Sequence, residues 1–184
     1  MRYSTTHKEQ TRQKLLQSSG ALAKRGGFAA TGVAGLMKAI GLTGGAFYNH
    51  FPSKDELFTE VVRRELSHSP IAQQPMNRAR LERCLEQYLS MAHLHNVEGG
   101  CAIPTLGAEI ARAEQPVRAE AEHWLCHLQQ AWAQTLEDPA LAWALISQCV
   151  GALVIARMLA SEPTQEEVLK ASRDFIAGAL HEAP

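Results

Sequence analysis

The sequence lacks the cysteine patterns that build small secreted domains and structural zinc sites. Its four cysteines are widely spaced, with no CxxC pair among Cys84, Cys101, Cys126 and Cys149. This spacing argues against a structural zinc site and against a disulfide scaffold. The simplest interpretation is four reduced thiols in the cytosol, and we expect neither a metal nor a cofactor.

The sequence also lacks a long uninterrupted apolar run. Residues 1–8 are polar, so they do not form a signal peptide. The longest apolar stretch, 140–160, is interrupted by Ser147, Gln148 and Arg157, which favours a buried helix over a membrane span. We therefore expect a cytoplasmic protein that does not bind a membrane.

Enzyme motifs are missing as well. The sequence has no glycine-rich phosphate loop, no nucleophile elbow and no HExxH. Serine, histidine and aspartate occur, but not at a spacing that implies a catalytic triad. The sequence therefore predicts a protein that is not an enzyme and leaves a helical protein-binding adaptor as one alternative.

Charge is unevenly distributed along the chain. Residues 1–54 hold eight basic residues and one acid, Glu9, a net charge of +7. Since the whole chain carries −1, the remainder carries −8. A basic head on an acidic body suits a head that binds a polyanion such as DNA. The alternative is that the charge asymmetry is accidental and lies on a solvated surface.

Helical periodicity dominates, and no segment alternates as a strand would. The pattern predicts an all-α fold, divided into a DNA-binding head at 1–54 and a helical body at 55–184. The most evident linker is 69–75, and capping boxes open two helices at Ser53–Glu56 and Thr164–Glu167. The predicted helices span residues 6–25, 32–40, 44–51, 54–67, 77–95, 104–113, 116–136, 139–160 and 164–180.

Residues 31–51 form the most informative segment, because they predict two short helices joined by a glycine turn. The first helix has an apolar inner stripe, and the second turns Leu42, Phe47 and Phe51 inward. The outer face of the second helix begins with small residues and continues with polar ones. Small leading residues allow a helix to approach base edges closely, although glycine weakens a helix by about 1 kcal/mol relative to alanine. The alternative is a plain helical hairpin that uses its glycines for close packing.

The run from Phe47 to Leu57 resembles the hallmark of the TetR family, in which Tyr-x-His-Phe ends the recognition helix and a Lys-Glu-Leu-like sequence opens the next one. The resemblance extends from Thr11 to Val62 and includes Gly27-Phe28 and Thr31. It implies a transcriptional regulator, most often a repressor, that binds a palindromic operator in double-stranded DNA as a homodimer. A small-molecule effector would release it.

The resemblance also implies roles for individual residues. Thr31 and Thr43 would cap the two short helices and donate to phosphates, which Tyr48, His50 and Lys54 would also contact. Gly44, Gly45, Ala46 and Asn49 would face the bases. Many members carry a lysine or arginine at the position of Gly44, and serine or threonine at that of Ala46. This chain therefore has few side chains that could hydrogen-bond directly to base edges. Ala46 would contact a thymine methyl, and Asn49 would make a polar contact.

The resemblance assigns the last two helices, near 139–160 and 164–180, to the dimer interface. Small residues on the first of them permit close approach, and the alternative is that both are ordinary core helices. The effector pocket would lie in the body. Its candidate lining residues, each of which would otherwise be ordinary core, are Tyr88, Met91, His95, Cys101, Trp124, His127, Trp132 and Trp143.

Cys101 has a second possible role. Gly100-Cys101 followed by Leu106 and Glu109 resembles a pattern in one large subgroup of TetR-type regulators. The thiol would sense oxidants or electrophiles if a nearby cation or helix N-terminus lowered its pKa. The alternative is a small buried residue without reactivity.

Overall fold

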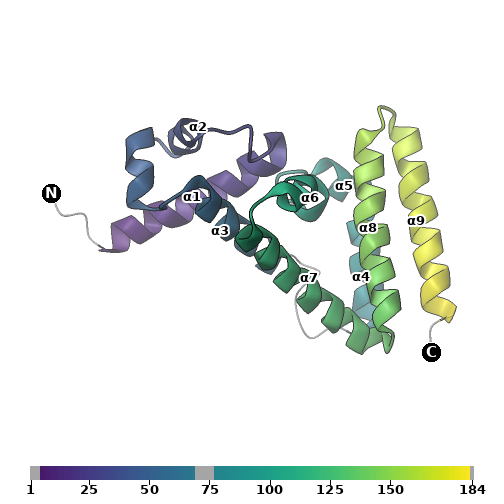
Figure 1. Ribbon diagram of the computed structural model, residues 1–184. Helices are drawn as coiled ribbons and strands as arrows, with labels where there is room; N and C mark the ends of the chain where they lie inside the picture. The colour runs from purple at the N-terminus through teal and green to yellow at the C-terminus, as the bar shows by residue number, and fades with distance from the viewer. Residues whose placement is uncertain (1–4, 69–76, 183–184) are drawn as a thin grey trace.

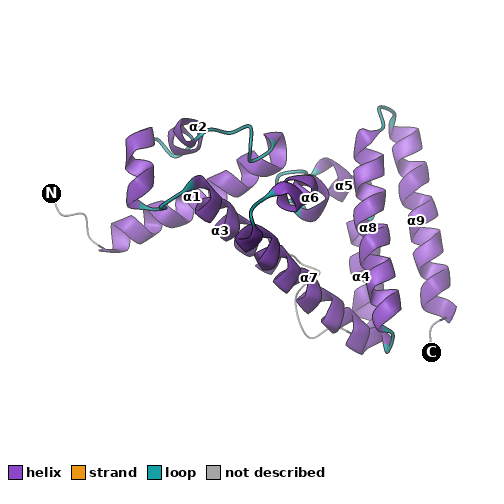
Figure 2. Ribbon diagram, viewed as in Figure 1, coloured by secondary structure: helices purple, strands orange, loops and turns teal. Residues whose placement is uncertain are grey.

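The computed structural model describes residues 5–68 and 77–182, and these residues form helices and connecting turns without a strand. The all-α prediction is confirmed. Figures 1 and 2 show α1, α2 and η1 gathered at one end, α8 and α9 side by side at the other, and α7 running between them. The elements are α1 (Thr5–Gly26), α2 (Val33–Lys38), η1 (Gly44–Asn49), α3 (Lys54–Ser67), α4 (Arg78–Tyr88), α5 (Met91–His95), α6 (Ile103–Arg112), α7 (Gln115–Leu136), α8 (Pro139–Met158) and α9 (Glu162–Glu182). The linker predicted at 69–75 lies outside the described residues.

Local capping signals explain where several helices begin. The Ser53 side chain accepts a hydrogen bond from the Glu56 amide at 3.0 Å, and α3 starts at the next residue, Lys54, as the sequence predicts. The Asp138 carboxylate accepts from the amides of Ala140 and Leu141 and opens α8. Both caps are set by neighbouring residues, so they could be read from the sequence.

Three predicted elements need correction. The helix expected at 77–95 is two helices, because α4 ends at Tyr88 and Ser90 caps α5 by accepting from His93 N at 3.2 Å. The second short helix is a 3₁₀ turn over Gly44–Asn49 and not an α-helix. The last helix begins at Glu162, with the Ser161 hydroxyl accepting from Thr164 N at 3.4 Å, so the predicted box at 164–167 lies inside α9.

Two apolar clusters form the interior. The first lies beneath α1, α2, η1 and α3, with Leu36, Phe47 and Leu57 fully buried, and extends to Leu106 of α6. The second fills the body between α4, α5, α7, α8 and α9 and includes Trp132. Since α7 packs against both α3 and α8, it connects the head to the body.

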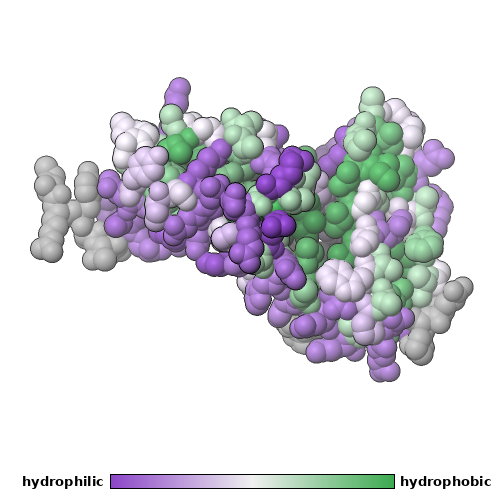
Figure 3. Space-filling view, in the orientation of Figure 1, coloured by the Kyte–Doolittle hydropathy of each residue, from purple (hydrophilic) through white to green (hydrophobic). Residues whose placement is uncertain are grey.

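The apolar character of α8 extends beyond the body core. Among the described residues it is the one helix long and apolar enough to span a membrane by length and composition, although core helices of other proteins pass the same test. Only 39% of its apolar window is buried. Figure 3 shows hydrophobic surface gathered over this end of the molecule, so part of the α8 surface is apolar and uncovered in the single chain.

Candidate nucleic-acid interface and body cavity

The 3₁₀ turn η1 is held on the head by aromatic side chains. Phe47 and Phe51 are almost fully buried, with ring centroids 6.0 Å apart. The chain reaches η1 from α2 through Gly41, whose φ of +75° is a conformation that glycine adopts readily. Two buried anchors on one side leave the other side of η1 free to face outward.

The outward side of η1 is small at its start and polar at its end. Thr43, Gly45, Tyr48 and Asn49 are exposed, and Tyr48 keeps 68% of its surface. Ala46, predicted to face the bases, is half-buried against the head core. Ala46 is therefore less accessible to a partner than the exposed residues of this face.

The glycines of η1 are not required by internal packing. A Cβ built on Gly45 would meet nothing within 4 Å. A Cβ on Gly44 would lie 3.6 Å from the Ala34 Cα, which is ordinary contact. Close packing among the described residues therefore does not explain these glycines. The other explanation is that they allow an external partner to approach closely.

The predicted capping role of Thr31 is wrong, whereas Thr43 does occupy the N-cap position of its element. Gly32 is the N-cap of α2, and the Thr31 hydroxyl instead donates to the Gly27 carbonyl at 3.2 Å. Thr43 is the N-cap residue of η1, but its side chain makes no capping hydrogen bond. The Thr43 hydroxyl is exposed and remains a predicted phosphate donor.

His50 and Lys54 lie at the edge of this face in different situations. His50 is half-buried, and its Nδ1 has no hydrogen-bond partner among the described residues. Burial lowers the pKa of His50, and the nearby Lys8, Arg12 and His7 lower it further. The Lys54 ammonium donates to the Ala29 carbonyl at 3.1 Å and lies 4.9 Å from the Phe28 ring centroid, so it supports the turn after α1.

Charged contacts connect the head to the body. The Glu109 carboxylate of α6 accepts from the amides of Phe28 and Ala29 at 3.1 and 2.8 Å. The buried Lys24 ammonium pairs with Glu65 at 2.6 Å and donates to the Gly100 carbonyl at 3.2 Å. No local pattern predicts the Lys24 contact with Gly100, because the two residues lie 76 positions apart.

A cavity of about 490 Å³ lies at this junction. Its lining combines Lys24 of α1 and the C-terminal end of α3 with residues from α4, α5 and the following loop: Lys24, Glu65, His68, Cys84, Gln87, Tyr88, Ser90, Ala92, His93, Asn96, Gly99, Gly100 and Cys101. Tyr88 and Cys101 are the two members of the predicted effector set found here. Lys24 and His93 are lining residues that sequence reasoning missed, since nothing local indicates that they converge.

The structure distributes the other predicted lining residues elsewhere. Trp132 is 1% exposed and lies in the body core, against which half-buried Met91 packs. His95 and His127 are exposed. The Trp124 indole donates to Glu120 at 2.9 Å, and Trp143 borders a separate apolar groove of about 300 Å³.

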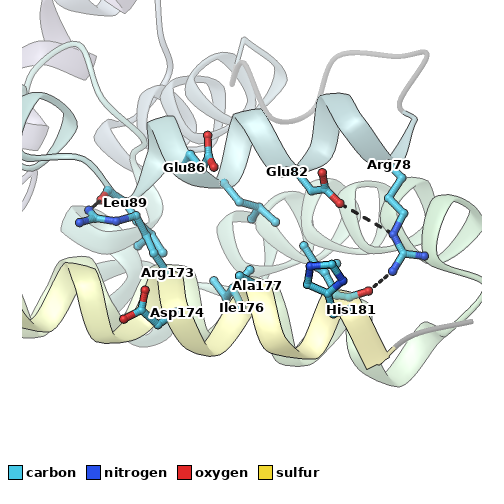
Figure 4. Close-up of a pocket in the computed structure, with 11 residues that line it drawn as sticks. Arg78, Glu82, Glu86, Leu89, Arg173, Asp174, Ile176, Ala177 and His181 are labelled. Carbon is cyan, nitrogen blue, oxygen red and sulfur yellow. Dashed lines mark hydrogen bonds and ion pairs between the residues drawn. The ribbon is translucent and has the colours of Figure 1, made fainter.

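A further cavity of about 540 Å³ separates α4 from α9 (Figure 4). The Arg78 guanidinium donates to the Leu180 carbonyl at one end, and Arg173 donates to the Leu89 carbonyl at the other. Both arginines thereby satisfy carbonyls at helix C-termini. Within residues 5–68 and 77–182, no group of three or more histidine, cysteine, aspartate or glutamate side chains could hold a metal.

Cys101 is a buried thiol. Burial raises the pKa of Cys101. This effect outweighs those of Tyr88, the Ile103 backbone and Arg157, which lower the pKa. A thiol with a raised pKa has little thiolate at neutral pH, and the thiolate is the reactive form.

Residues 15–61 match the family model described as bacterial regulatory proteins, tetR family. The whole chain shares its fold with solved structures of low sequence identity. NemR from E. coli, in its reduced form, is 22% identical with a TM-score of 0.77, and the match covers 92% of this chain and 97% of that one. No curated protein is similar enough in sequence to count as a relative.

Two further structures extend this likeness. A TetR transcriptional regulator from Legionella pneumophila is 21% identical with a TM-score of 0.71, over 97% of this chain and 99% of that one. A putative transcriptional regulator from Saccharomonospora viridis in complex with choline is 19% identical with a TM-score of 0.74, over 92% and 96% of the two chains. At these identities the likeness establishes a shared fold.

Proposed function

Because the chain belongs to the TetR family of bacterial regulatory proteins, we propose that it is a cytoplasmic, ligand-responsive repressor that binds a palindromic operator as a homodimer. The observation that carries this proposal is the outer face of η1. Gly44 and Gly45 leave room at its start, and Tyr48 and Asn49 project from its exposed end. Such a face suits the major groove, where base edges specify sequence and phosphates fix position.

The charge of the head supports an electrostatic contribution to binding. Residues 1–54 carry +7, and each cation that neutralises a phosphate releases counterions from the duplex. Affinity for DNA should therefore fall steeply with salt. A helical adaptor that binds another protein would not be expected to show this salt dependence of DNA affinity.

The test is a gel shift with a duplex selected from an unbiased pool of double-stranded oligonucleotides. We predict that a Tyr48→Ala, Lys54→Ala double variant binds at least about tenfold more weakly, because two phosphate contacts are lost. The slope of log affinity against log salt should fall by about one, since one cation is removed.

Two controls separate DNA contact from stability. Lys54 also supports the turn after α1, so the thermal unfolding of the double variant is measured alongside Tyr48→Ala alone. Arg83→Ala removes an exposed cation of α4, outside the head and the proposed dimer helices, and should leave DNA binding unchanged. Undiminished DNA binding by a folded double variant would contradict the assigned contacts.

Dimerisation is proposed through α8 and α9. Several large apolar side chains on these helices are exposed in the single chain, among them Ile155 at 52%, Met158 at 77% and Phe175 at 61%. Contiguous apolar surface on a soluble chain usually marks an interface. Two heads related by a two-fold axis would read half-sites about 34–36 Å apart, or a multiple of that spacing.

Release by a small molecule is proposed at the junction between head and body. A ligand shifts an equilibrium only by its different affinities for the two states, and the cavity at this junction includes Lys24 and Gly100, which connect the two parts. The Saccharomonospora viridis protein was solved with choline, which supports a small-molecule effector as a class.

A thiol-sensing role for Cys101 receives less support. Its position in the cavity wall favours it, but burial raises the pKa of the thiol. Arg157 and Lys24 lower the pKa of Cys101, but burial raises it more strongly, and Lys24 is already paired with Glu65. We therefore favour reversible ligand binding over covalent sensing.

A further inference from the structure

Glu109 of α6 ends the sequence pattern that begins at Gly100 and includes Leu106. Glu109 lies three residues after Leu106, so the two side chains share one face of the helix. Leu106 is fully buried in the apolar cluster beneath the head helices. The burial of Leu106 therefore turns Glu109 toward the head.

The Glu109 carboxylate binds the turn between α1 and α2 at two points. Its Oε1 accepts from the Phe28 amide at 3.1 Å, and its Oε2 accepts from the Ala29 amide at 2.8 Å. Hydrogen bonds to an ionised acceptor are stronger than those between neutral groups. Gly27, whose φ is +86°, leaves space for this approach, because a Cβ there would lie 2.5 Å from Oε1 of Glu109. The turn is thus built around a carboxylate that comes from another helix.

The same turn holds the ammonium of Lys54. Lys54 Nζ donates to the Ala29 carbonyl at 3.1 Å and lies 4.9 Å from the centroid of the Phe28 ring. Phe28 is itself fixed by stacking on Phe58, with ring centroids 4.3 Å apart. Glu109 and Lys54 therefore hold the two ends of one residue, since Glu109 accepts from the Ala29 amide and Lys54 donates to the Ala29 carbonyl.

An ammonium has three donors, and Lys54 gives one of them to Ala29. The others can serve a DNA phosphate, which is the contact proposed for Lys54. A group that is already held in its binding position loses less conformational freedom when the partner arrives.

We propose that Glu109 is a positioning residue for DNA binding: it fixes the Ala29 peptide, which holds the Lys54 ammonium in place for a phosphate. The inference rests on the proposed function, because it requires that the head contacts DNA. It assigns to a residue of α6, outside the helix-turn-helix, a part of the DNA affinity.

Glu109→Gln tests this role in the full-length protein, by gel shift with the selected duplex. Glutamine has the shape of glutamate, but its NH₂ group would face one of the two amides without accepting from it. We expect DNA affinity to fall about tenfold, the effect of one hydrogen bond to a charged group. The loss of a negative charge would by itself strengthen binding to DNA, so a fall cannot come from the charge.

Glu120→Gln is the matched control. The Glu120 carboxylate of α7 also accepts two hydrogen bonds from another helix, from Arg63 of α3 at 3.0 and 2.8 Å. The substitution makes the same change in charge and shape but leaves the turn after α1 untouched. DNA affinity should stay within about threefold of the wild type.

A double-mutant cycle separates the positioning of Lys54 from general support of the head. In the Lys54→Ala background, Glu109→Gln should weaken DNA binding by no more than about twofold, because the ammonium that Glu109 positions is gone. Hydrogen exchange gives a readout without DNA: the amides of Phe28 and Ala29 should exchange faster in Glu109→Gln than in the wild type or in Glu120→Gln.

Thermal unfolding verifies that each variant is folded. If Glu109→Gln does not fold, Glu109→Asp replaces it with the same expectation, because it withdraws the carboxylate by one methylene and keeps the charge.

Several results would overturn the positioning role while the wild type still binds a duplex: undiminished affinity in the folded Glu109 variant, an equal fall in Glu120→Gln, a fall of about tenfold that persists in the Lys54→Ala background, or unchanged exchange of the two amides. A wild-type protein that binds no duplex overturns the proposed function, and the positioning role with it.

Discussion

His93 joins three parts of the body through its imidazole ring and its backbone carbonyl. Its Nδ1 meets the Tyr88 carbonyl at the end of α4, its Nε2 accepts from the Cys101 amide, and its own carbonyl accepts from Arg157 of α8 at 3.5 Å. Burial is the largest effect on the pKa of His93 and lowers it. The charge of Arg157 lowers this pKa further, while the hydrogen bond to the Tyr88 carbonyl raises it. The folded protein therefore favours the neutral ring.

This shift predicts that acid destabilises the fold. Between the lowered pKa of folded His93 and its ordinary value near 6.5, the unfolded chain binds more protons than the folded one. The free energy of unfolding should then fall as the pH drops below about 6.5. His50, whose pKa is also lowered, contributes in the same direction.

Variants should separate the contribution of His93. At pH 7, we expect His93→Gln to lower the free energy of unfolding by about 1–3 kcal/mol, because the ring that bridges the Tyr88 carbonyl and the Cys101 amide is lost, and to have a shallower pH dependence. His95→Gln, an exposed site in the same helix, should retain the wild-type slope. Urea unfolding at pH 5 to 7 measures all three proteins, and equal slopes for wild type and His93→Gln would refute the assignment.

At the scale of elements, α1 and α3 approach each other closely at Gly20. A Cβ at this position would lie 2.3 Å from Oε1 of Glu65. Glu65 is not free to withdraw without cost, because it pairs with the buried Lys24 ammonium. The absence of a side chain at Gly20 thus preserves an ion pair between two helices.

We predict that Gly20→Ala lowers the free energy of unfolding by about 1–3 kcal/mol, as overpacking commonly does. Gly107 of α6 is the matched control, since a Cβ there would meet nothing within 4 Å. Gly107→Ala should stabilise by up to about 1 kcal/mol through helix propensity alone. Thermal unfolding of both variants checks the pair, and a neutral or stabilising Gly20→Ala would contradict the packing argument.

At the scale of the whole molecule, hydrophobic surface gathers at the end of the molecule formed by α8 and α9 (Figure 3), and Ile155, Met158 and Phe175 of these helices are exposed. We predict that Phe175→Asp weakens dimerisation by at least about tenfold, because an unpaired carboxylate would be buried in the interface. Operator affinity should fall with it, since one head alone makes few contacts.

Analytical ultracentrifugation measures this effect directly. Gln130→Asp adds the same charge at an exposed position of α7 and serves as the control for net charge. A Phe175→Asp protein that remains as dimeric as the control would exclude this face as the interface.

Sequence patterns predicted those features that neighbouring residues determine. The bounds of α3 agreed because Ser53 caps it locally, and the fold class followed from helical periodicity. The break between α4 and α5 was missed because the apolar pattern continues through Leu89, which is fully buried where the helix stops. The two-domain boundary after residue 54 stays a prediction.

The amino-acid order by itself determined the helical class and the match of residues 15–61 to the tetR family model, because periodicity and motifs depend on residues that are close together in the sequence. The tertiary structure decided the rest: Trp132 fills the core, Tyr88 and Cys101 share a cavity, and Lys24 meets Gly100 across 76 positions. Convergence of distant side chains is set by how helices pack, and packing depends on all of their surfaces at once.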